Sequence, residues 1–113
     1  MTRRVVVTGM GMVSPLGHNV EETWANIKAG KSGIAPITRF DSTSYNVHIA
    51  AEIKDWDATK YMSAKDARRR DLNQQFTVAA AQEAMRSSGL VIDDSNRGRT
   101  GVVIGSALAG EAA

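Results

Sequence analysis

The sequence predicts an α/β fold built on a parallel sheet. Residues 5–7 are three consecutive valines, and residues 100–105 read TGVVIG; runs of β-branched residues like these are typical of strands buried on both faces. Each run is followed by a loop of glycines and small residues, and helical patterns fill the chain between them. Strands joined by helical crossovers pair in parallel with right-handed connections.

The first strand leads into a glycine loop, RRVVVTGMGMVSPLG over residues 3–17. A dinucleotide-binding fingerprint would place its third glycine at position 14, which is Ser14, followed by Pro15. The loop is therefore interpreted as a strand-to-helix turn that needs glycine for its backbone angles. A fragment of a nucleotide-dependent oxidoreductase stays as an alternative.

A helix is predicted after this loop. Asn19 is a good N-cap, Glu22 stands in capping-box position, and Gly30 is a natural C′ residue. Apolar residues recur at helical spacing at Val20, Trp24 and Ile27.

Residues 31–62 form a long connection with several glycine, proline and serine positions. Within it, residues 47–53 alternate, which predicts an edge strand or hairpin arm. The apolar face holds Val47, Ile49, Ala51 and Ile53, and Glu52 lies on the opposite face.

A second helix is predicted from Ser63 to Ser88, ending at Gly89, with Asp66 in capping-box position. Its second half is rich in alanine, which indicates close packing on more than one side, as in a helix between layers. Residues 93–99 predict a polar turn.

Three cations on this helix, Lys65, Arg68 and Arg69, fall within an arc of about 100°. Arg70 points elsewhere and can pair with Asp66. In the first two turns of a long helix the macrodipole disfavours cations, which suggests a functional reason for them, such as binding of an acidic or phosphorylated partner. The alternative interpretation is an ordinary solvated helix face.

Composition limits the other possibilities. The chain has 113 residues, a net charge of +2 and no cysteine, which excludes a disulfide scaffold, a thiolate metal site and a cysteine nucleophile within these residues. The charge is too small to imply nucleic acid, and no segment is apolar enough to span a membrane. We expect a cytoplasmic protein without metal or cofactor, with His18 and His48 in structural roles. Two clear central strands are too few for a parallel sheet, so a fragment of something longer is expected.

Several blocks together resemble a known family. VVVTGMGMVSPLG, KAGKSGI, ITRFD, KDARRRD and RTGVVIGSALAG stand in the order and spacing of the N-terminus of β-ketoacyl-acyl-carrier-protein synthases. The resemblance is closest to the type II condensing enzymes of fatty acid synthesis, and it extends from Arg3 to about Gly110. It implies a thiolase-like fold with αβαβα layers, usually a homodimer, of which residues 1–113 form only the first part of the N-terminal half.

The resemblance also implies the chemistry and the partner. The catalytic cysteine and two histidines of the family lie beyond Ala113, so no catalytic residue is assigned here, and we expect these 113 residues alone to be inactive. Lys65, Arg68 and Arg69 match the basic patch that docks acyl carrier protein, and Leu108 matches an aliphatic residue at the acyl pocket, flanked here by Ala107 and Ala109. A type II polyketide ketosynthase or its chain-length factor is the alternative within the fold, and a bare carrier-protein-binding module is another.

Overall fold

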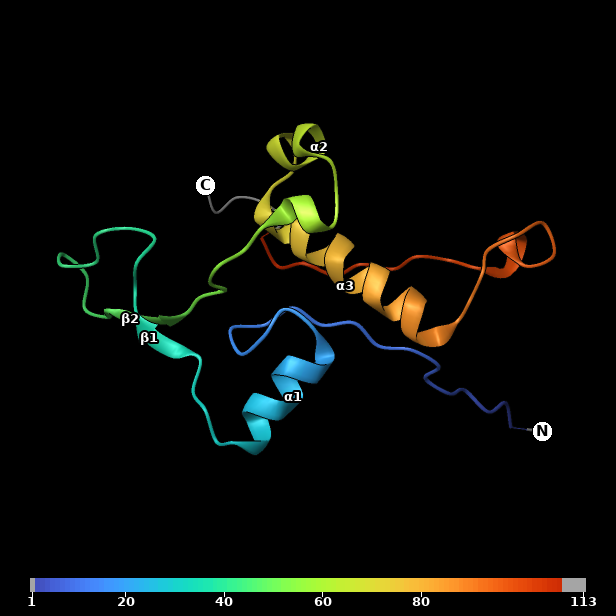
Figure 1. Cartoon of the computed structure of the whole chain (residues 1–113), viewed down its shortest axis with the longest axis horizontal. Helices are drawn as coiled ribbons and strands as arrows, with labels where there is room; N and C mark the ends of the chain where they lie inside the picture. Colours follow the sequence, from blue (N-terminus) through green and yellow to red (C-terminus); the bar gives the residue numbers. More distant parts are fainter. Residues whose placement is uncertain (1, 109–113) are drawn as a thin grey trace. The chain divides into compact units, whose positions relative to one another are not determined.

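The computed structural model describes residues 2–108 of the chain, drawn in Figure 1. The chain divides into two compact units, one made of Met1–Gly11 and Ala58–Ala113, the other of Met12–Asp57. No helix in the described part of the chain is long and apolar enough to cross a membrane. Each unit contains at least one helix of its own.

In the unit Met12–Asp57, helix α1 (Val20–Lys28) begins and ends where the sequence predicted. Asn19 Oδ1 accepts a hydrogen bond of 2.8 Å from the Glu22 N–H. At the other end Gly30 has φ 69°, and the Gly30 and Lys31 N–H groups donate to Ile27 and Asn26 at 3.0 Å each. This pair of bonds is a Schellman motif, so both caps are confirmed.

The packing of α1 differs from the expectation. Trp24 and Ile27 are exposed, whereas Thr23 is buried. The Thr23 hydroxyl lies 2.8 Å from that of Ser14, and Asn26 Nδ2 donates to the Leu16 carbonyl. Polar contacts to the Ser14–Gly17 turn, not the apolar stripe, therefore attach this helix within its unit.

The same unit contains a two-stranded antiparallel sheet, β1 (Ile34–Pro36) and β2 (Ile49–Ala51), with Ile34 opposite Ala51. The predicted hairpin arm is confirmed, although the strand is shorter than residues 47–53. Its inner face is the opposite of the one expected: Ile49 is exposed, while Glu52, just past the strand, is buried. Glu52 is drawn inward because three groups of the neighbouring loop donate hydrogen bonds to its carboxylate.

In the other unit, the single helix predicted over residues 63–88 is wrong. The chain forms two helices, α2 (Ala64–Arg69) and α3 (Leu72–Ser88). They are separated by Arg70, whose backbone is extended at φ −115° and ψ 139°, and by Asp71, which stands at the N-cap of α3. Asp71 is an N-cap residue type, but its side chain makes no capping hydrogen bond, so the extended backbone of Arg70 marks the break.

Helix α3 packs closely against the glycine loop. A Cβ atom on Gly9 would lie 2.6 Å from the Ser88 nitrogen, and one on Gly11 would lie 2.9 Å from the Ala84 nitrogen. Ala79 is 2% exposed and is the only buried hydrophobic residue among those described. The close packing predicted for the alanine-rich helix is therefore confirmed on this side. The expected packing on more than one side is not formed among the described residues, because an open groove runs along Val78, Ala81 and Met85. Helix α3 ends at Gly89, with φ 69°, as predicted.

The two predicted central strands are not formed within residues 2–108. Residues 5–7 and 100–105 have no strand partner, and Val103 is 96% exposed. A strand exists only as part of a hydrogen-bonded ladder, and β1–β2 is the one sheet of the described residues. The prediction of a parallel pair is wrong for this part of the chain.

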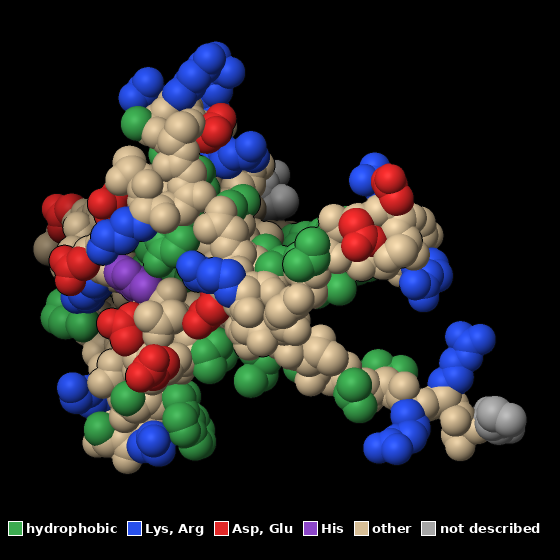
Figure 2. Space-filling model, turned by 45° about the vertical axis from the view of Figure 1, so that its right-hand side comes forward, with side chains coloured by type: hydrophobic (Ala, Val, Ile, Leu, Met, Phe, Trp, Pro, Cys, Tyr) green, Lys and Arg blue, Asp and Glu red, His purple; other side chains and the backbone are tan. Residues whose placement is uncertain are grey.

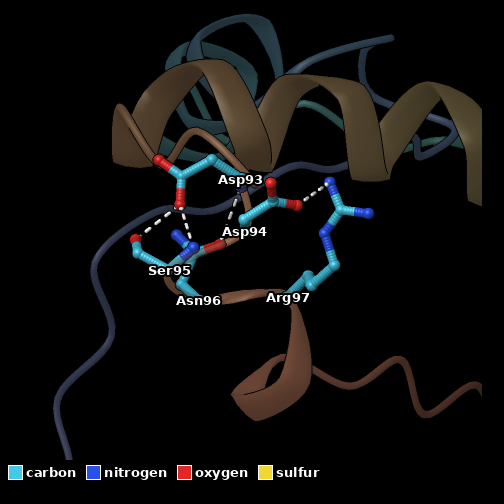
Figure 3. Close-up of polar contacts among 5 residues, drawn as sticks. All are labelled: Asp93, Asp94, Ser95, Asn96 and Arg97. Carbon is cyan, nitrogen blue, oxygen red and sulfur yellow. Dashed lines mark hydrogen bonds and ion pairs between the residues drawn. The ribbon is translucent and has the colours of Figure 1, made fainter.

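A short polar segment follows α3, as predicted (Figure 3). Asp93 accepts hydrogen bonds from the hydroxyl and the N–H of Ser95, and its own N–H donates to Asn96 Oδ1 at 2.9 Å. The hydrogen bond from the Ser95 hydroxyl, and after it the one from the Ser95 N–H, lower the pKa of Asp93, although burial acts in the opposite direction. Asp94 and Arg97 form an ion pair of 2.8 Å, and the 3-10 helix η2 (Arg97–Arg99) follows. Local bonding accounts for these polar side chains.

Candidate functional site

The basic helix α2 is the strongest candidate site in the described residues. Ser63 caps it: its Oγ accepts from the Asp66 N–H at 3.1 Å and donates to Asp66 Oδ2 at 3.0 Å. Lys65, Arg68 and Arg69 all lie on this six-residue helix and all are exposed. Figure 2 shows Lys and Arg side chains gathered at the upper end, where α2 lies. The structure therefore brings the three predicted docking residues together on one exposed element.

The electrostatic setting of these cations differs from the expectation. Because α2 ends at Arg69, Arg68 and Arg69 stand in its last turn, where the carbonyl end of a helix favours positive charge. The expected conflict with the macrodipole is therefore wrong for both arginines. The expected pair of Asp66 with Arg70 is also not formed among the described residues, since Arg70 lies outside the helix and Asp66 bonds Ser63.

Leu108, the predicted acyl-pocket residue, lies at the end of the described residues and is 67% exposed. It follows Ala107, while Ala109 and Gly110 lie outside the described residues. Leu108 and the three cations belong to the same unit, but to separate segments of it.

Both histidines are hydrogen-bonded to backbone carbonyls, which agrees with the structural roles predicted for them. His18 Nε2 lies 2.7 Å from the Lys54 oxygen, and its ring meets Trp56 edge to face at 5.4 Å. His48 Nδ1 lies 2.9 Å from the Ser42 oxygen. A carbonyl oxygen only accepts, so each of these two ring nitrogens carries the proton of its hydrogen bond. Both residues have structural partners.

Glu52 is a buried carboxylate to which the sequence assigned no role. It is 9% exposed and accepts from the Thr38 N–H and Thr38 Oγ1 at 3.0 Å each, and from the Arg39 N–H at 3.2 Å. Burial by itself raises the pKa of Glu52, but the hydrogen bonds from Thr38 and Arg39, helped by the charge of Lys54, outweigh it and leave the pKa lowered. The sequence signal for this site was the alternation of residues 47–53, which placed Glu52 on the same strand face as the small Ala50.

One side of α3 carries an open apolar groove of about 440 Å³. Its lining residues are Val78, Ala81, Gln82, Met85 and Arg86. Gln82 is also tied to the segment before α2, because its Nε2 donates to the Tyr61 carbonyl at 2.8 Å. The groove contains no nucleophile or acid–base pair.

The chain matches a known protein family along nearly its whole length. The family model described as beta-ketoacyl synthase, N-terminal domain, matches residues 2–113. The 3-oxoacyl-[acyl-carrier-protein] synthase 2 of Vibrio harveyi is 50% identical over 108 residues, which cover 96% of this chain and 26% of that protein. The proteins of the same name from Coxiella burnetii and Staphylococcus aureus strain N315 are 47% and 44% identical over the same shares.

Among solved structures, the ishigamide ketosynthase/chain length factor matches with a TM-score of 0.67 and 38% identity, over 79% of this chain and 22% of that one. The chain thus spans about a quarter of the length of the curated relatives it matches.

Proposed function

Because the chain belongs to the beta-ketoacyl synthase N-terminal domain family, we propose that it is part of a fatty-acid-elongating 3-oxoacyl-acyl-carrier-protein synthase. The observation that carries this proposal is 50% identity across 96% of the chain to a 3-oxoacyl-[acyl-carrier-protein] synthase 2. We place the residues 1–113 in the first part of the N-terminal half of a thiolase-like fold, in a cytoplasmic homodimer.

The proposed reaction is a decarboxylative Claisen condensation. An acyl group moves from carrier protein to an enzyme cysteine as a thioester. Malonyl-carrier protein then loses carbon dioxide, and the resulting carbanion forms the new carbon–carbon bond at the thioester carbonyl while the cysteine thiolate leaves. The family uses two histidines beside this cysteine, and we assign all three residues to positions after Ala113. The role proposed for the described residues is therefore to bind the carrier protein and the acyl chain.

Lys65, Arg68 and Arg69 are proposed to dock the acidic carrier protein. Support comes from their exposure and from their position together on α2, without an ion-pair partner among the described residues. Exposed charges of this kind act mainly on association rate and partner choice. Leu108 is proposed to line the acyl pocket, where its bulk would limit the acyl chain.

A chimeric synthase tests the activity. In it, this chain replaces the matching residues of the Vibrio harveyi relative, and product is measured from acyl- and malonyl-carrier protein beside the unaltered relative. We expect condensation by the chimeric synthase and none by the 113 residues alone. A chimeric synthase that melts cooperatively like its parent but forms no product would contradict the proposal. If no folded chimera is obtained, salt-sensitive binding of carrier protein to the 113-residue chain decides the docking part.

Charge reversal tests the docking surface. In the chimeric synthase, Arg68→Glu with Arg69→Glu should raise the KM for malonyl-carrier protein at least tenfold at low salt and reduce its salt dependence, because attraction becomes repulsion. Arg97→Glu is the matched control, since it reverses a cation already paired with Asp94. An unchanged KM in the double variant would remove the docking assignment.

A polyketide ketosynthase is the second candidate, favoured by the 38% identity to the ishigamide ketosynthase/chain length factor. The curated fatty acid synthases are more similar to this chain. Mass spectrometry of an acylated cysteine in the intact protein would distinguish a condensing chain from a chain-length factor without a nucleophile. The oxidoreductase alternative requires NAD or NADP binding, and the backbone of α3 already occupies the space beside Gly9 and Gly11.

A further inference from the structure

Helix α2 has little of its own to hold it in place. It has six residues and none of them is buried. Its chain leaves through Arg70, whose backbone is extended, before α3 begins. A helix this short is not stable by itself, so its direction depends on contacts outside it.

Gln75 supplies such a contact from the first turn of α3. Its side chain is 8% exposed, and Nε2 donates to the Ala67 carbonyl at 2.9 Å and to the Arg70 carbonyl at 3.1 Å. Ala67 lies in α2, and its oxygen also accepts a longer bond of 3.4 Å from the Arg70 N–H. One amide thus joins the last turn of α2, the break and the start of α3.

The chemistry of the amide suits this position. A glutamine –NH₂ group has two donors, so it can serve two carbonyls at once, whereas a glutamate or methionine of similar size has none for this purpose. Carbonyls at the end of a helix lack intrahelical partners, and burial makes it costly to leave them unbonded.

We propose that Gln75 is a positioning residue for the docking surface: by holding the end of α2 against α3, it fixes the direction in which Arg68 and Arg69 face a carrier protein. The inference rests on the proposed function and goes beyond it, since it assigns the orientation of the cations to a buried side chain of α3. Arg68 and Arg69 directly precede the break that Gln75 bridges.

Kinetics on the chimeric synthase test the role. Gln75→Met should leave kcat within twofold and raise the KM for malonyl-carrier protein by a factor of about 3 to 10, because the productive orientation of α2 is then only partly populated. The KM for malonyl-coenzyme A, which lacks the carrier protein, should not change. Gln74→Met is the matched control, since Gln74 is the exposed neighbour on the same helix.

Two further measurements separate the possible outcomes. Amides of residues 64–70 should exchange hydrogen faster in Gln75→Met and not in Gln74→Met. If Gln75 acts through the arginines, Gln75→Met should have no further effect once Arg68 and Arg69 are reversed to glutamate.

The inference is overturned if Gln75→Met leaves the carrier-protein KM unchanged while the arginine reversal raises it. It is also overturned if Gln75→Met impairs both substrates equally or prevents folding, which would show a general structural role. If the arginine reversal itself has no effect, the docking assignment fails instead, and the exchange of residues 64–70 still shows whether Gln75 holds α2.

Discussion

At the scale of single residues, the glycine loop is explained by what passes beside it. Gly9 and Gly11 have no positive φ, so backbone conformation does not demand glycine there. The demand comes from α3: a Cβ atom on Gly11 would overlap the Ala80 carbonyl and approach the Ala84 nitrogen. The prediction that these glycines serve a tight turn is therefore wrong, and the close backbone contact with α3 that explains them could not be predicted from the sequence.

Gly11→Ala should therefore destabilise the fold by about 1 to 3 kcal/mol, because the helix backbone must move to admit the methyl group. The melting temperature of the chimeric synthase measures this effect. Gly98→Ala is the control, since a Cβ atom there meets nothing within 4 Å and its φ is not positive. Equal melting temperatures for the two variants would show that α3 does not approach the loop this closely.

At the scale of elements, hydrogen bonds between neighbouring segments determine which face of a strand is buried, and hydrophobic periodicity does not. Glu52 fixes the residues after β1 to the end of β2 through Thr38 and Arg39. Periodicity located the strand but assigned the wrong inner face, because it ranks side chains by hydrophobicity and cannot include the loop N–H groups that satisfy a carboxylate.

The lowered pKa of Glu52 makes this link sensitive to acid. The unfolded carboxyl has a pKa of about 4.3, and the folded one lies lower, so the link stabilises fully above about pH 5 and is lost as pH falls through the folded pKa. In the chimeric synthase, Glu52→Gln should lower the melting temperature at pH 7. The difference in melting temperature from the unsubstituted chimeric synthase should shrink below about pH 4. Melting curves between pH 3 and 7 measure it, with exposed Glu21→Gln as control. A difference that does not change with pH would contradict the assignment.

The break between α2 and α3 shows how far local signals extend. Ser63 and Asp71 are both N-cap residue types eight positions apart, and a 26-residue helix was expected only because apolar and small residues continue through both. The caps at Asn19, Gly30 and Gly89 were predictable because each depends on a residue type at one position. Gln75 bridges the break, and its two carbonyl partners are known only from the fold.

At the scale of the whole molecule, the order of several sequence blocks identified the family, whereas the sheet could not be assembled from them. Ladders need neighbours, and the described residues supply none to residues 5–7 or 100–105. The sequence of these runs is typical of strands buried on both faces, yet their valines and isoleucine are exposed in the structure. The family blocks singled out the three cations that we propose for docking, but not that Arg68 and Arg69 lie in the last turn of a short helix.

These exposed runs predict a difference between the chain alone and the chimeric synthase. If residues 5–7 and 102–104 are central strands of a larger sheet, their amides should exchange hydrogen rapidly in the 113-residue chain and slowly in the chimeric synthase, because ladder bonds form only with strands from the rest of the protein. Amides in the middle of α3, near Ala79, are the internal reference, since their helical bonds exist in both. Hydrogen exchange read by mass spectrometry distinguishes the cases. If both runs exchange equally fast in the chain alone and in an active chimeric synthase, their role as central strands is refuted.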